Sequence, residues 1–261
     1  MSNETTLLSV TKSEWIKFRT VRSTIMGVLT FVVLTIGLSV LFAWAVRGHW
    51  HDMSFSDKLT FDPTSTSLGG TQLAQFAVGV IGSLFITSEY ASGAIRTTLA
   101  AVPNRARLVL AKLLVLAASI LVIGELVCVT TFLIGMRIFS GVVPTTSLSS
   151  GPVLRAVLMA GVYLTLLTLL GFALGLILRH SAATISVYTV LLLVVPIIGL
   201  FLPQNWQNVF QRYEPLSLGG SMMSVQPQSN GFGVWSAFAI LALYVAVVLA
   251  VGVTMLQRRD A

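Results

Sequence analysis

A group of charged side chains lies between two long apolar runs of the sequence, in residues 87–112. Its members are Glu89, Arg96, Arg105, Arg107 and Lys112. Charges placed between two runs that can each cross a bilayer indicate a segment that meets lipid headgroups or a molecule outside the bilayer. We therefore expect this stretch to bind something at the membrane surface. No Ser-His-Asp set or pair of membrane glutamates suggests an intramembrane protease.

Residues 94–101 are predicted to form a short helix inside this stretch. Gly93 can break the preceding helix, and Pro103 turns the chain after the short one. Ile95 and Leu99 are four residues apart and so share one helical face. Such a helix, lying across the inner face of a membrane, would offer a few apolar side chains ringed by charge to a groove on a soluble partner. The alternative is an ordinary loop whose arginines anchor it to the lipid headgroups.

Glu125 is the only acidic residue well inside an apolar run. A charge at the bilayer centre costs roughly 2.5–3.5 kcal/mol on insertion scales, so its side chain should face protein or water. It is a candidate cavity residue that would contact a cationic substrate group or a proton. The alternative is a structural hydrogen bond to a serine or threonine of a neighbouring helix, or to Arg137.

The remaining polar clusters predict no catalytic, cofactor-binding or metal site. His49, His51 and Asp52 form an H-x-H-D sequence, but two histidines in a flexible loop lack the further ligands and second shell that a metal needs. Met222 and Met223 are expected to be hydrophobic cover for a loop rather than copper ligands.

Composition places most of the chain in lipid. Of its 261 residues, 55% are hydrophobic and 10% are charged, whereas soluble domains have about 25% charged residues. We predict a single membrane domain over residues 1–261. The net charge of +7 does not indicate nucleic-acid binding, because the basic residues lie beside the ends of apolar runs.

Six apolar runs are long enough to cross a hydrocarbon core of about 30 Å. The predicted spans are residues 23–46, 71–88, 108–139, 153–178, 182–202 and 234–256. The fold class is therefore all-α, a polytopic bundle of six transmembrane helices. Gly171 and Gly175 form a small-xxx-small pair that allows close helix approach, and Pro196 is expected to kink the fifth span.

Residues 6–20 are predicted to form an amphipathic helix on the membrane surface. Thr11 and Glu14 have the spacing of a capping box. The alternative is that this segment is only the charged flank of the first span.

The distribution of basic residues predicts the orientation. With six spans, 11 of the 16 lysine and arginine residues fall on the side that holds both termini and residues 89–107. The positive-inside rule then places both termini in the cytoplasm of a multi-pass cell-membrane protein.

The sequence also resembles a known family. An acidic residue closing a helix, followed by Tyr, Gly, Ile-Arg, Leu, Pro, Arg and Ala-Lys, is similar to the cytoplasmic loop of type-2 ABC-transporter permeases. SEWIKFRTVRST (Ser13–Thr24) is similar to the N-terminal interfacial helix of that family, and RYEPLSLGG (Arg212–Gly220) fits its outer loop before the last span. The resemblance covers nearly the whole chain.

This resemblance implies a permease of an ATP-driven exporter, whose coupling helix docks on a separate ATPase subunit. Carried over by position, the ATPase-coupling residues would be Glu89, Gly93, Arg96, Pro103, Arg105 and Lys112. The sequence has no G-x-x-x-x-G-K-[ST] motif, so ATP and Mg²⁺ would bind to the partner and this chain would not be an enzyme. The expected partners are a cytoplasmic ABC ATPase, a second permease copy or a homologous permease, and the lipid bilayer.

Two other functions remain open from the sequence. One is a secondary transporter driven by an ion gradient, although intramembrane charges are few and no internal repeat is visible. The other is a non-transporting scaffold that uses the same loop to recruit an ATPase. ATP-dependent flux separates the exporter from the scaffold.

Overall fold

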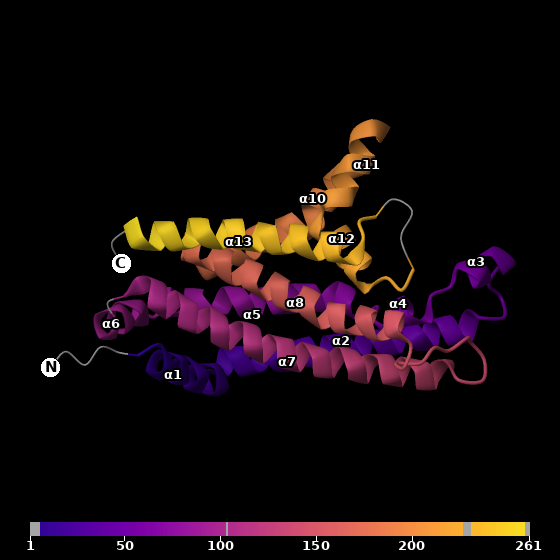
Figure 1. Cartoon of the computed structure of the whole chain (residues 1–261), viewed down its shortest axis with the longest axis horizontal. Coiled ribbons are helices and arrows are strands. Elements are labelled where there is room, and N and C mark those ends of the chain that lie inside the picture. The colour runs from indigo at the N-terminus through magenta and orange to yellow at the C-terminus, as the bar shows by residue number, and fades with distance from the viewer. Residues whose placement is uncertain (1–5, 103, 227–230, 259–261) are drawn as a thin grey trace.

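The structure is a computed structural model that describes residues 6–102, 104–226 and 231–258, and these ranges contain helices but no strand (Figure 1). In the part of the chain so described, six helices are long and apolar enough to cross a membrane. The predicted all-α class with six spans is confirmed. The spans are α2 (Arg22–His49), α5 (Thr71–Ala91), α7 (Arg105–Phe139), α8 (Gly151–Leu178), residues Ser181–Gly199, and α13 (Val234–Arg258).

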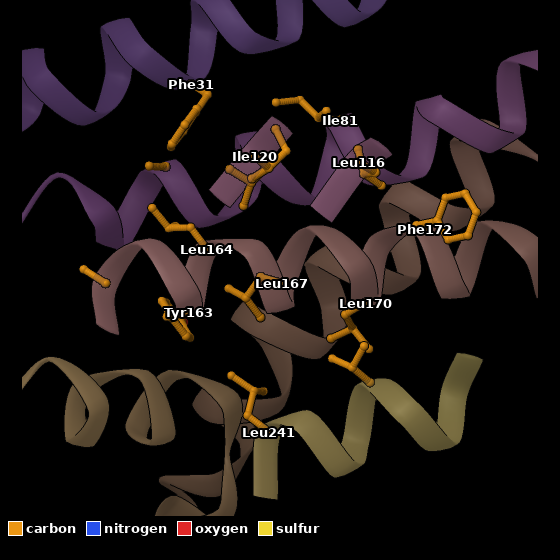
Figure 2. Packing of buried hydrophobic residues seen from close by; sticks show 14 of the residues in the cluster. Phe31, Ile81, Leu116, Ile120, Tyr163, Leu164, Leu167, Leu170, Phe172 and Leu241 are labelled. Carbon is orange, nitrogen blue, oxygen red and sulfur yellow. The ribbon is translucent and has the colours of Figure 1, made fainter. Parts of the chain in front are cut away.

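Helix α8 is the centre of the bundle and packs against α5, α7 and α13. It is apolar on every side, as a helix surrounded by other helices must be. Figure 2 shows Leu164 and Leu167 of α8 in the same hydrophobic core as Leu116 and Ile120 of α7. The same hydrophobic cluster contains residues of α2, α5 and α13, so the spans share one core.

Glycines allow α5 and α8 to lie very close to each other. A Cβ atom on Gly82 of α5 would collide with the carbonyl oxygen of Thr168, and one on Gly171 of α8 would collide with the carbonyl oxygen of Gly79. A Cβ atom on Gly175 would lie 2.5 Å from the side chain of Ile86. The close approach predicted from Gly171 and Gly175 is therefore confirmed, and α5 contributes matching glycines.

The fifth span is interrupted at its middle. It consists of α9 (Ser181–Thr189), the π-helical segment η1 (Val190–Val194) and α10 (Val195–Gly199). Pro196 has no N–H to donate, and its ring clashes with the carbonyl four residues earlier in a regular α-helix, so the helix widens at this point. The predicted disturbance at Pro196 is therefore present as a change of helix type.

Both long connecting segments contain short helices that the sequence did not predict. The first contains α3 (Phe55–Thr60) and α4 (Pro63–Ser67), and the second contains α11 (Gln204–Tyr213) and α12 (Pro215–Met223). The backbone of Gly219 in α12 lies against the ring of Tyr163, where a side chain would not fit. Met222 and Met223 are buried in the core, deeper than loop cover would be.

A helix, α1 (Leu7–Thr20), is present where the sequence predicts one, and it packs against α7 and α2. Its N-cap is Thr6, whose hydroxyl accepts a hydrogen bond from the backbone N–H of Ser9. The predicted capping box is therefore wrong. The hydroxyl of Thr11 instead donates to a backbone carbonyl of the preceding turn, and Glu14 is buried against the bundle.

The two ends of the bundle differ. Helices α1 and α6 (Ala94–Ala101) and the last turn of α13 lie at one end, which we call the inner end (Figure 1). Helices α3, α4 and α12 lie toward the opposite, outer end. The described part of the chain therefore begins and ends on the same side, as an even number of spans requires.

Candidate functional site at the inner end

Four charged side chains from three helices form an ion network at the inner end. The Lys112 ammonium of α7 donates to Glu14 Oε2 of α1 and to Glu89 Oε1 of α5, each at 2.7 Å. The Lys17 ammonium of α1 donates to Glu14 Oε1 and to Glu89 Oε1, each at 2.8 Å. The ion pairs of this network therefore link α1 to the last turn of α5 and to the first turns of α7.

The network is shielded from solvent at its centre. The side chains of Lys112 and Glu14 are each 1% exposed, and that of Lys17 is 34% exposed. Lys112 also lies 5.2 Å from the centre of the Phe85 ring, a cation–π contact. Two carboxylates and two ammonium groups balance in charge. Loss of one partner would leave an uncompensated buried charge, which costs roughly 3–5 kcal/mol.

The protonation of Lys17 follows from these contacts. Partial burial is the largest single effect and opposes the charge, but the hydrogen bonds and the electrostatic attraction to Glu14 and Glu89 together outweigh it and raise the pKa of Lys17. The group therefore stays charged throughout the physiological range of pH, and so does its bridge to both carboxylates.

Helix α6 lies across the inner end between α5 and α7. It begins after Gly93, whose φ of 71° is in the left-handed region that glycine adopts without steric cost. Ile95 is buried and Leu99 is half-buried, since this face packs toward α1 and α7. The prediction that α6 offers this apolar pair to a partner is therefore wrong. The exposed face instead carries Arg96 and Thr97.

A groove of about 350 Å³, lined by both apolar and polar side chains, separates α6 from α1. Its walls carry the hydroxyl groups of Ser9, Ser13, Thr97 and Thr98, and Lys17 of the ion network lies at its edge. The groove and the exposed face of α6 together form a surface of mixed polarity at the inner end.

The structure distributes the predicted coupling residues over three positions. Glu89 and Lys112 belong to the buried ion network. Gly93 forms the turn before α6, and Arg96 lies on the exposed face of that helix. Arg105 lies at the start of α7, next to the end of α13. Pro103 lies outside the described residues. The docking role of these residues stays a prediction.

Arg105 connects two membrane helices. Its guanidinium donates to the carbonyl oxygens of Leu256 at 2.6 Å and Gln257 at 3.4 Å, at the last turn of α13. A cation that binds the free carbonyls at a helix C-terminus also interacts favourably with the helix dipole. Arg105 therefore joins the start of α7 to the end of α13.

Glu14 and Lys17 were not predicted as part of the site. Glu14 lies 98 residues from Lys112 in the sequence, and Lys17 lies 72 residues from Glu89. One signal was available, because Val10, Glu14 and Phe18 recur every four residues and put a carboxylate within an apolar helical face. All three are buried.

Glu125 lies half-buried on α7, against Gly161 of α8. A Cβ atom on Gly161 would lie 2.6 Å from the Glu125 carboxyl carbon, so this glycine makes room for the carboxylate. Within the described ranges, Glu125 Oε2 is buried without a hydrogen-bond partner. The alternative of a hydrogen bond to a hydroxyl or to Arg137 is not found among these residues, and a cavity role stays a prediction.

A comparison with protein-family models matches residues 10–195 to the model described as ABC-2 family transporter protein. This chain belongs to the ABC-2 transporter family. The match includes most of α1, all of α6 and the whole ion network, while α11, α12 and α13 lie beyond it. A search of curated proteins found no match. Family and fold together make this ABC-2 permease a multi-pass membrane component of a transporter.

Proposed function

We propose that this ABC-2 permease is the membrane-spanning subunit of an ATP-driven exporter, and that a separate ATPase subunit binds its inner end. The observation that carries the proposal is the ion network of Lys112, Glu14, Glu89 and Lys17. It makes α1, the end of α5 and the start of α7 one mechanical unit, with α6 held between them.

This unit suits the transmission of force into the membrane. Helix α6 follows α5 after two residues, and Lys112 lies about 10 Å into α7 at 1.5 Å of rise per residue. A displacement of α6 therefore moves the inner ends of two spans together, while the buried ion pairs keep α1 from separating. ATP would close two ATPase subunits, and the spans would rock between two arrangements.

The proposed surface for the ATPase is the exposed face of α6 and the adjoining groove. Arg96 is exposed on this face of α6, and the next residue, Thr97, lines the groove. We expect the partner to place acidic and hydrogen-bonding side chains against this surface, because a charge-assisted hydrogen bond to arginine is stronger than a neutral one.

The proposed assembly contains two membrane subunits, because six spans form too small a bundle to enclose a pathway. The second would be another copy of this chain or a homologous permease. Both termini would lie in the cytoplasm, in keeping with the excess of basic residues on that side. ATP and Mg²⁺ would bind to the ATPase subunits.

The test is co-purification followed by an activity measurement. The tagged permease, solubilised from its native membranes, should carry an ATPase whose hydrolysis rate rises with some members of a panel of amphiphiles. Arg96→Glu should greatly reduce the amount of ATPase recovered. Arg22→Glu reverses another exposed arginine at the same end and should leave recovery unchanged. Equal recovery with Arg96→Glu and wild type would contradict the docking surface.

A further inference from the structure

A second hollow opens to the side of the bundle, away from the inner end. It has a volume of about 750 Å³ and lies between α8, the broken fifth span, α11 and α13. Figure 1 shows why it exists, since α10 and α11 leave the bundle and extend away from α13. Ligand pockets in proteins typically have volumes of about 300–1,000 Å³, so this pocket has the size for a small molecule.

The pocket is built from aromatic and aliphatic side chains. Trp206, Phe210 and Tyr213 of α11 line one side, and Tyr244 of α13 lines another. The Tyr244 hydroxyl donates to the carbonyl oxygen of Tyr213 at 3.1 Å, which ties α13 to the end of α11. This hydrogen bond therefore connects two sides of the pocket. The faces of these rings are attractive to cations.

Glu214 is the one ionisable carboxylate among the described residues that line this pocket. Its Oε1 accepts a hydrogen bond from the Ser217 hydroxyl at 2.8 Å. Its Oε2 is buried, and no residue in the described ranges donates a hydrogen bond to it. Burial raises the pKa of the Glu214 carboxyl, although the Ser217 hydrogen bond opposes this. Among the described residues, no ion pair is formed by Glu214.

We propose that this pocket binds hydrophobic cations, which enter from the lipid and place their positive charge at Glu214. The apolar lining accepts the body of the molecule, and Glu214 with the surrounding rings selects the sign of its charge. An anion of the same shape would meet the carboxylate and is excluded. This binding needs no ATPase and does not depend on the function proposed above.

The experiment uses two molecules of nearly the same shape and opposite charge. The purified full-length chain in lipid nanodiscs is titrated with radiolabelled tetraphenylphosphonium, with tetraphenylborate as the matched anion. We expect saturable binding that unlabelled tetraphenylphosphonium displaces and tetraphenylborate does not. Equal displacement by both ions would overturn the proposal.

Two variants assign the binding to the pocket. Glu214→Gln keeps an oxygen for the Ser217 hydrogen bond but removes the charge, and should weaken tetraphenylphosphonium binding at least about ten-fold. Asp57→Asn, at an exposed carboxylate of α3, should leave the affinity unchanged. Val248→Trp fills the pocket from α13 with the charge intact and should abolish saturable binding.

Wild-type affinity in either Glu214→Gln or Val248→Trp would overturn the assignment. Each variant is first checked by gel filtration for a single species. If one of the two does not fold, the other still decides the outcome, because one removes charge and the other removes space.

Discussion

Replacing Lys112 with methionine removes the ammonium group at the centre of the ion network and keeps the length of the side chain. Glu14 and Glu89 are then left with Lys17 alone, so one negative charge is uncompensated in a buried site. Such a loss costs roughly 3–5 kcal/mol. Because Lys112 joins α7 to α1, we expect the cost to appear as release of α1 from the bundle.

The release can be measured by cysteine accessibility. Val10 of α1 is 5% exposed, so a Val10→Cys reporter should react slowly with a membrane-impermeant maleimide in nanodiscs. The native Cys128 is buried and should not contribute. A loss of 3 kcal/mol corresponds to an increase in labelling rate of roughly a hundred-fold, since about 1.4 kcal/mol is a factor of ten.

A charge-balanced double variant separates charge from packing. Glu89→Gln together with Lys112→Met leaves Glu14 and Lys17 as a neutral pair, so labelling should return most of the way to the wild-type rate. Lys12→Met, at an exposed lysine of α1, should leave the labelling rate unchanged. Wild-type labelling in Lys112→Met would refute the role of the network. A double variant as reactive as the single one would refute charge balance as its cause.

Three further outcomes follow from the structure. Gly93→Ala forces a side chain into the left-handed region and should lower stability by about 1–2 kcal/mol, which thermal unfolding would register; an unchanged midpoint would contradict the need for glycine at this turn. Gly82→Ala should destabilise the α5–α8 contact strongly, whereas Gly37→Ala, where a Cβ atom meets open space, should be neutral in the same assay. The raised pKa of Lys17 means that its contribution is complete below its ordinary pKa of 10.5 and is lost as pH rises through the higher value in the folded state. Fluorescence of Trp15 on α1 should therefore be constant from neutral pH to about pH 10 and change only above it; a transition near neutral pH would contradict the bridge.

The membrane helices could be predicted from the sequence because each has at least 19 residues and carries a continuous apolar signal. The close packing at Gly171 and the break at Pro196 could also be predicted, since each follows from the chemistry of one residue. The short helices α3, α4, α11 and α12 gave no comparable signal. They have five to ten residues each, and tertiary packing rather than periodicity stabilises helices of that length.

The candidate site was predicted in part. Glu89 and Lys112 could be selected because they lie in the charged stretch between two apolar runs that resembles the cytoplasmic loop of the family, but their burial could not be foreseen. It depends on the return of α1 to the inner end, which pairs Glu14 with a lysine 98 residues away. The burial of Ile95 likewise depends on where α1 and α7 lie, which the sequence does not show. A helical face of two apolar residues packs equally well against a partner or against its own bundle, and only the position of α1 and α7 decides between them.

We propose that an ATPase binds the inner end of this permease through α6. A photo-crosslinking amino acid placed at Thr97, on the exposed face of α6, tests it in native membranes, with Ser149 at the exposed connection between α7 and α8 as the matched position. We predict that Thr97 captures a chain containing a Walker A motif, identified by mass spectrometry, and that Ser149 does not. Capture of no such chain from Thr97, or labelling of a cysteine at Thr97 from outside intact cells, would contradict the claim.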